Sequence, residues 1–177
     1  EKVYEKTGIQ FMNFNSLFQL AAMRAHNDSA LQAAEKILFI PDALMYMLTG
    51  EAVCEYTILS TSQRLDPRTK RIDPELLDSI GLKETHFGRY VNPSDKVGTL
   101  LPEIQESTGV GPVPVIAVAG HDTGAAVAAV PAQDEHYAYL SCGTWSLLGI
   151  ETREAIINEK SFQYNFTNEG GIEGTTR

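Results

Sequence analysis

Residues Pro114–Ala126 read PVIAVAGHDTGAA, an apolar run followed by a glycine and three polar residues. The branched apolar side chains at the start of this stretch are typical of a buried strand. Gly120 permits a tight turn after the strand. The alanine-rich residues that follow predict a helix over residues 124–130. The stretch therefore predicts a strand, a turn carrying His121, Asp122 and Thr123, and a helix, which is the repeating unit of an α/β fold.

The turn has two interpretations that the stretch alone leaves open. In open α/β sheets, ligands bind at the carboxyl ends of the strands, so Asp122 is a candidate base or Mg²⁺-organising carboxylate. Aspartate is also a preferred residue at the N-terminus of a helix, where its carboxylate accepts hydrogen bonds from free backbone amides. His121 has the same two interpretations, a chemical role or a purely structural hydrogen bond.

A second polar turn follows about twenty residues later. Residues 137–150 read YAYLSCGTWSLLGI, and aromatic and aliphatic residues flank the small polar centre from Ser141 to Thr144. This pattern predicts two short strands joined by a tight turn. Such a turn exposes the Gly143 and Thr144 amides and the Thr144 hydroxyl, which suit phosphate oxygens. An ordinary hairpin is the alternative, but two polar turns after two apolar strands favour a phosphate site.

These two turns resemble conserved motifs of the FGGY family of carbohydrate kinases. The matching segments are GHDTGAA at residues 120–126 and YLSCGTWSLLG at residues 139–149. Further segments match in the same order along nearly the whole chain: YEKTGIQFM (4–12), PD through LTG (41–50), EYT (55–57), HFGR (86–89) and TNEGG (167–171).

The resemblance implies an α/β fold of the actin-like ATPase, or ribonuclease-H-like, type. It implies that residues 1–133 are the rear part of the first domain, which binds sugar and carries the catalytic base. Residues 134–177 are expected to begin the second, nucleotide-binding domain. The first phosphate loop and the adenosine pocket have no counterpart in these 177 residues, so we expect the chain to be a fragment that is inactive by itself.

The resemblance also implies roles for individual residues. Asp122 is the expected catalytic base, and His121 and Thr123 are expected to contact the sugar. Gly143 and Thr144 are expected to contact ATP, which acts with Mg²⁺, whose ligands the sequence does not assign. The expected reaction transfers the ATP γ-phosphate to the 1-hydroxyl of L-rhamnulose. A kinase for L-fuculose or D-xylulose and a non-catalytic sugar-binding sensor are the alternatives.

The composition limits the classes of partner. The formal net charge of −9 and the lack of a basic cluster argue against a nucleic-acid surface. No apolar run approaches the roughly 20 residues of a membrane span. Cys54 and Cys142 lie far apart in the chain and form no Cys-x-x-Cys pair, which is typical of reduced thiols in a cytoplasmic protein. The sequence makes no prediction of oligomeric state.

The first half of the chain is predicted to be mainly helical. The apolar spacing, caps and helix-ending glycines predict helices over residues 16–24, 30–39, 41–49, 74–80 and 102–108. In the third of these, Leu44, Met47 and Leu48 are expected to face the core. Tyr56, Thr57 and Gln63 are further candidates for shaping the sugar pocket.

Overall fold

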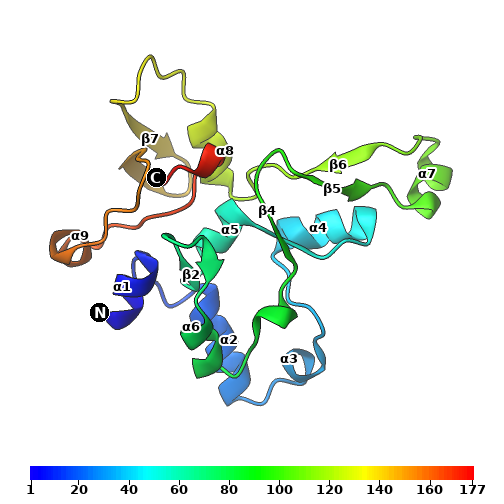
Figure 1. Cartoon of the computed structure of the whole chain (residues 1–177), viewed down its shortest axis with the longest axis horizontal. Helices are drawn as coiled ribbons and strands as arrows, with labels where there is room; N and C mark the ends of the chain where they lie inside the picture. The colour runs from blue at the N-terminus through cyan, green and yellow to red at the C-terminus, as the bar shows by residue number, and fades with distance from the viewer.

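Short helices and two-stranded sheets make up the fold, which Figure 1 shows as a computed structural model of residues 1–177. The α-helices are α1 (Lys2–Thr7), α2 (Ser16–Ala25), α3 (Ser29–Ala33), α4 (Ile40–Thr49), α5 (Tyr56–Ser60), α6 (Pro74–Ser79), α7 (Pro102–Thr108), α8 (Asp122–Ala128) and α9 (Glu159–Gln163). The strands are β1 (Val53–Glu55), β2 (Leu65–Asp66), β3 (Arg71–Ile72), β4 (Arg89–Val91), β5 (Lys96–Thr99), β6 (Pro114–Ile116), β7 (Ala138–Cys142) and β8 (Ser146–Ile150).

Local signals set most helix ends. In α4, Pro41 lies in the first turn, and Gly50 ends the helix with a φ of 75° that favours glycine. In α6, the Asp73 side chain accepts a hydrogen bond from the Leu76 amide at 2.9 Å, as expected of an N-cap. The predicted extents of the helices over 41–49, 74–80 and 102–108 are confirmed to within a residue.

The helix predicted over residues 30–39 is wrong in its length. Helix α3 ends at Ala33, and the backbone at Ala34 is extended. The Ile37 amide donates to the His86 carbonyl at 2.7 Å, so a partner distant in sequence supplies the hydrogen bond that a longer helix would have supplied. A tertiary contact thus replaces the local helical pattern here.

The four sheets each have two strands. Strands β1 and β4 are parallel, whereas β2–β3, β5–β6 and β7–β8 are antiparallel. The hairpin predicted over residues 137–150 is confirmed as β7 and β8. The prediction that the strand before Gly120 is buried is wrong, because Ile116 is 45% exposed and Val118 is 70% exposed. A two-stranded sheet leaves a strand with few neighbours to cover its faces.

Helix α4 also presents a different face from the predicted one. Leu44, Met47 and Leu48 are exposed, while Asp42 and Thr49 are buried. Helix α4 packs beside β1 and β5 through the side that carries these polar residues. The periodicity of the apolar residues identified a helix correctly, but it did not identify which side the protein covers.

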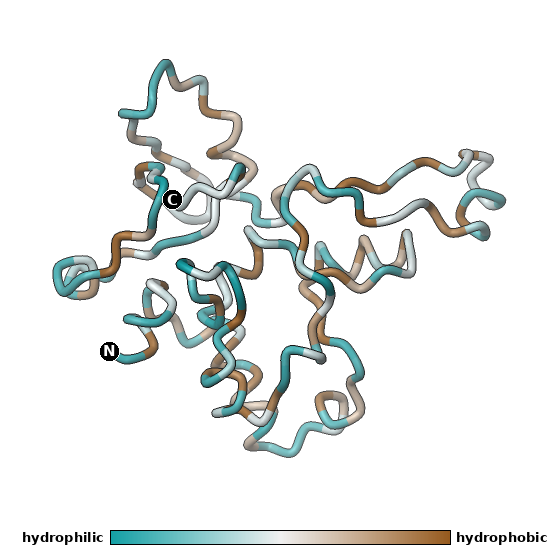
Figure 2. The backbone as a smooth tube through the Cα atoms, viewed as in Figure 1, coloured by the Kyte–Doolittle hydropathy of each residue, from teal (hydrophilic) through white to brown (hydrophobic).

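The main hydrophobic cluster lies in the body formed by α2, α5, α6 and the β2–β3 hairpin, and it includes Leu17, Leu59 and Leu77. A smaller cluster joins β1, β4, β5 and the residue after β6, and it consists of Val53, Val91, Val97 and Ala117. Figure 2 shows further apolar segments along the β5–β6 arm, outside this body. No helix is both long and apolar enough to traverse a bilayer.

The two ends of the chain pack against each other. The Tyr4 hydroxyl donates to the Phe166 carbonyl at 2.8 Å, and the Asn168 side chain donates to the Gly8 carbonyl at 3.1 Å. The Gly170 amide donates to the Ser60 hydroxyl at 2.7 Å, which ties the same segment to the end of α5. These contacts place residues 166–170 beside α1, Gly8 and the end of α5.

Candidate active site

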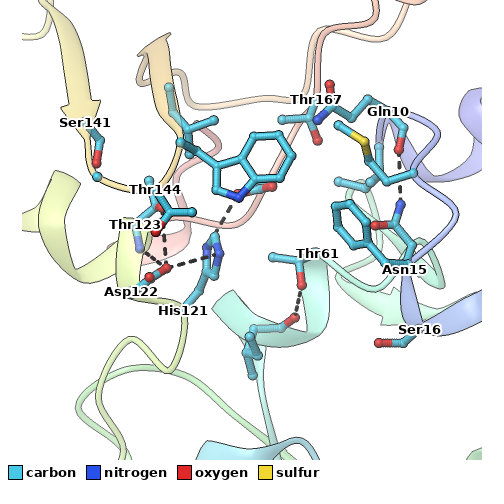
Figure 3. Close-up of a pocket in the computed structure, with 18 residues that line it drawn as sticks. Gln10, Asn15, Ser16, Thr61, His121, Asp122, Thr123, Ser141, Thr144 and Thr167 are labelled. Carbon is cyan, nitrogen blue, oxygen red and sulfur yellow. Dashed lines mark hydrogen bonds and ion pairs between the residues drawn. The ribbon is translucent and has the colours of Figure 1, made fainter. Parts of the chain in front are cut away.

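Polar residues from five parts of the chain line a pocket of about 400 Å³. The loop after α1, the end of α5, the start of α8, the β7–β8 turn and residues 167–169 all contribute to its walls. In Figure 3, His121, Asp122, Thr123 and Thr144 lie on one side of this pocket, while Gln10 and Asn15 lie on the other. The two polar turns singled out in the sequence therefore meet at one cavity.

Asp122 is the first residue of α8, and its side chain is 94% exposed. Its Oδ1 atom accepts a hydrogen bond from the Thr123 amide at 2.7 Å, and its Oδ2 atom has no partner in the protein. The N-cap position belongs to His121, which makes no side-chain cap bond. One carboxylate oxygen is thus anchored to the helix and the other is available to a ligand.

His121 is held between two carboxylates. Its Nε2 lies 3.5 Å from Asp122 Oδ1, and its Nδ1 lies 3.5 Å from Glu169 Oε2. The Arg177 guanidinium contacts the same Nδ1 atom. Burial lowers the pKa of His121 below its usual value; Glu169 opposes the shift and Arg177 adds to it. A neutral imidazole that accepts from Arg177 at Nδ1 carries its proton on Nε2, facing Asp122.

The Glu169–Arg177 ion pair contacts the Nδ1 side of the His121 imidazole. Arg177 Nη2 lies 2.7 Å from Glu169 Oε2, and both side chains are largely buried. The guanidinium makes both contacts through Nη2, while its buried Nε has no partner in the protein. Sequence reasoning assigned no role to either residue, because nothing local links positions 169 and 177 to a turn at 121.

Strand β7 contributes Ser141 to the pocket, and the β7–β8 turn contributes Gly143, Thr144 and Trp145. The Thr144 amide and hydroxyl have no hydrogen-bond partner in the protein, and the residue is exposed. The expectation for Gly143 is wrong in one respect, because its amide donates to the Trp145 carbonyl at 2.8 Å and is not free. The hairpin needs that bond to close its turn.

The pocket also contains polar residues to which the sequence assigned no role. Gln10, Asn15, Ser16, Thr61 and Thr167 line the pocket. They lie in loops or at helix ends, and although two of them, Gln10 and Thr167, fall in segments that resemble the family, no local pattern assigns them to a pocket.

The three further sugar-pocket candidates do not line the pocket. Tyr56, Thr57 and Gln63 are buried behind it. Gln63 acts indirectly, since its Oε1 accepts from Asn15 Nδ2 at 2.9 Å and thereby orients a residue of the pocket wall. Thr57 contacts the backbone of the His121 turn instead of the pocket.

Comparison with known proteins identifies the class. Residues 1–129 match the N-terminal domain of the FGGY family of carbohydrate kinases. The chain belongs to this family. The fold agrees: a xylulose kinase from Lactobacillus acidophilus superimposes with a TM-score of 0.84 at 19% identity, over 99% of this chain and 35% of its own. A glycerol kinase from Plasmodium falciparum, solved with ADP, has a TM-score of 0.78 at 18% identity, over 95% of this chain and 33% of its own. The predicted actin-like α/β fold is confirmed.

In sequence, the chain is similar to rhamnulokinases. The rhamnulokinase of Bacteroides thetaiotaomicron is 62% identical over 99% of this chain. That of Oceanobacillus iheyensis is 44% identical over 98% of this chain. The chain spans 36% of the length of each of these two relatives.

Proposed function

We propose that the chain is part of an ATP-dependent rhamnulokinase. The reaction transfers the ATP γ-phosphate to the 1-hydroxyl of L-rhamnulose and forms L-rhamnulose 1-phosphate. The observation that carries the proposal is the pocket in which Asp122 faces the Thr144 turn, in a chain 62% identical to a rhamnulokinase. A carboxylate beside unpaired amide and hydroxyl donors is what phosphoryl transfer to an alcohol needs.

In this proposal Asp122 acts as the general base. Its free Oδ2 accepts the proton of the sugar hydroxyl while Oδ1 stays bonded to the Thr123 amide. His121, with its proton on Nε2, and the Thr123 side chain bind and orient the ketose. Because phosphoryl transfer depends mainly on positioning and charge neutralisation, this fixed geometry is the chain's main contribution.

The turn between β7 and β8 would hold phosphate oxygens of ATP. The Thr144 amide and hydroxyl are unpaired and line the pocket, so they fit an anion, while Gly143 shapes the turn. Mg²⁺ neutralises the phosphate charge when it is bound with ATP. Mg²⁺ is usually held by one or two carboxylates together with substrate phosphates, so we expect it to bind with ATP, and we assign no metal ligand in this chain.

We further propose a domain boundary between residues 133 and 134, with the sugar-binding domain before it and the nucleotide-binding domain after it. The support is the connector between α8 and β7, which separates the Asp122 turn from the Thr144 turn along the chain. We place the protein in the cytoplasm, because Cys54 and Cys142 are both free thiols, which fits a reducing compartment.

The test is a kinase assay of the full-length protein against a panel of ketoses with ATP and Mg²⁺. We expect L-rhamnulose to have the highest kcat/KM, and Asp122→Asn to lower kcat by at least ~10²-fold while sugar binding persists. Asp78→Asn, which changes an exposed carboxylate of α6, is the matched control and should leave kcat unchanged.

Three outcomes would contradict the proposal. A preference for L-fuculose or D-xylulose would refute the substrate. Near-normal turnover of Asp122→Asn would remove Asp122 from the role of base. Sugar binding without phosphorylation by the wild-type protein would point to a sensor in place of a kinase.

A further inference from the structure

A buried glutamate lies directly beneath the turn that presents Asp122. Glu55, at the end of β1, is 0% exposed. Its Oε2 atom accepts hydrogen bonds from the Thr57 hydroxyl at 2.6 Å, the Ile58 amide at 3.1 Å and the Gly120 amide at 3.0 Å. Its Oε1 atom accepts from the Thr57 amide at 2.8 Å. A buried carboxylate is stable only when it is bonded in this way, so the turn supplies part of what keeps Glu55 in place.

Thr57 links Glu55 to His121, the next residue of the turn after Gly120. Its hydroxyl donates to Glu55 and accepts a hydrogen bond from the His121 amide at 3.2 Å. Two consecutive amides, those of Gly120 and His121, are therefore held by side chains from the start of α5. These amides precede the first residue of α8, so no carbonyl of that helix accepts them.

The backbone of the turn approaches Glu55 closely at Gly120. A Cβ atom at this position would lie 3.0 Å from Glu55 Oε2 and 3.3 Å from Pro41. The sequence suggested that Gly120 is there to permit a tight turn, but its φ is not in the left-handed region. A side chain at this position would be tight against the Glu55 carboxylate and Pro41 of α4, so one of them would have to move by a few tenths of an ångström.

We propose that Glu55 and Thr57 are positioning residues for the sugar-phosphorylating site. By holding the Gly120 and His121 amides, they fix the entry of α8 and hence the places of His121 and Asp122 in the pocket. The proposal rests on the proposed kinase function. Neither residue lines the pocket, so their effect on the reaction is indirect.

The magnitude follows from the demands of phosphoryl transfer. Displacing a catalytic group by about 1 Å can lower the rate by ~10²-fold. Thr57→Val keeps the shape of the side chain but removes the acceptor for His121 and one donor to Glu55. We therefore expect kcat to fall by about 10- to 100-fold, with the KM for ATP unchanged. Thr57→Ser restores the hydroxyl and should restore most of kcat.

Loss of a helix cap is the competing explanation, because Glu55 also caps α5. Thr57→Val leaves the bonds from Glu55 to the Thr57 and Ile58 amides in place, so it separates the two roles. Asp28→Ala is the matched control: it removes a side-chain cap from α3, at the Leu31 amide, far from the pocket. This control should lower stability and leave kcat unchanged.

The experiment combines steady-state kinetics with amide hydrogen exchange on the full-length protein. In Thr57→Val, we expect faster exchange in peptides that cover residues 118–124, together with the loss in kcat. Wild-type kcat in Thr57→Val, or unchanged exchange in that peptide, would overturn the proposal. If the wild-type protein phosphorylates no ketose, the proposed function fails, while the exchange measurement still decides whether Thr57 holds the turn.

Discussion

Asp42 makes the stability of this protein depend on pH in an unusual direction. The side chain is 0% exposed, its Oδ1 accepts from the Glu55 amide at 3.1 Å, and its Oδ2 has no partner. Burial, with the nearby Glu55 charge as a smaller cause, raises the pKa of Asp42 to about 7. The substitution Asp42→Asn removes the titration and keeps the size of the side chain.

The sign follows from proton binding. In the unfolded chain an aspartate releases its proton near pH 3.9, whereas folded Asp42 retains its proton up to about pH 7. The folded state therefore binds more protons between these values, and stability falls as the pH rises through this window. At about 1.4 kcal/mol per pH unit, with the loss levelling off near pH 7, this group lowers the free energy of unfolding by roughly 3 kcal/mol between pH 5 and pH 8.

The assay is amide hydrogen exchange in increasing urea, followed in peptides that cover residues 40–60 of the full-length protein and corrected for intrinsic exchange rates. Between pH 5 and pH 8, the opening free energy of the wild type should fall by roughly 3 kcal/mol more than that of Asp42→Asn. Asp78→Asn, at an exposed position, should behave as the wild type. Parallel pH dependence in the wild type and Asp42→Asn would refute the reasoning.

Two further predictions concern stability. In Gly88→Ala, the new Cβ would lie 2.5 Å from the backbone of β1, so the paired strands β1 and β4 would have to move apart. We therefore expect a lower denaturation temperature. An unchanged denaturation temperature would contradict the close approach of the two backbones. Arg64 is 1% exposed and lies against the Phe39 and Phe87 rings, and burial lowers its pKa to about 10. The apolar substitution Arg64→Met should therefore keep or raise the denaturation temperature. Arg64→Ala leaves a cavity and should lower the free energy of unfolding, measured by urea titration, by about 3 kcal/mol. A strongly destabilised Arg64→Met would show that the charge itself is needed.

Much of the local structure was predictable because its causes lie within a few residues. The side chain of Asp73 reaches an amide three residues away, and Gly50 and Gly109 adopt the positive φ that ends a helix. The strands at residues 138–150 follow from alternating apolar residues around a small polar centre. Where a distant partner competes, as at Ile37, the local prediction of helix length was wrong.

The site was predictable only in part. The turn residues at 121–123 and the turn at 143–144 follow from sequence motifs, and the structure brings them to one pocket. For the opposite wall, Gln10 and Thr167 lie in segments that resemble the family, but no local pattern in the sequence places Gln10, Asn15 and Thr167 at this pocket. Its residues reach the pocket because residues 166–170 pack against α1 and α5, through contacts that span more than a hundred residues.

The sequence by itself determined the family, the helix boundaries set by caps and glycines, and the turn that carries Asp122. These depend on backbone geometry and hydrogen bonds within single turns. The tertiary structure alone decided that Asp42 and Glu55 are buried, that Glu55 lies beneath that turn, and that the backbone at Gly120 packs closely against Glu55. Burial and proton affinity depend on what the rest of the chain places around a side chain, and no pattern of neighbours in sequence contains that information.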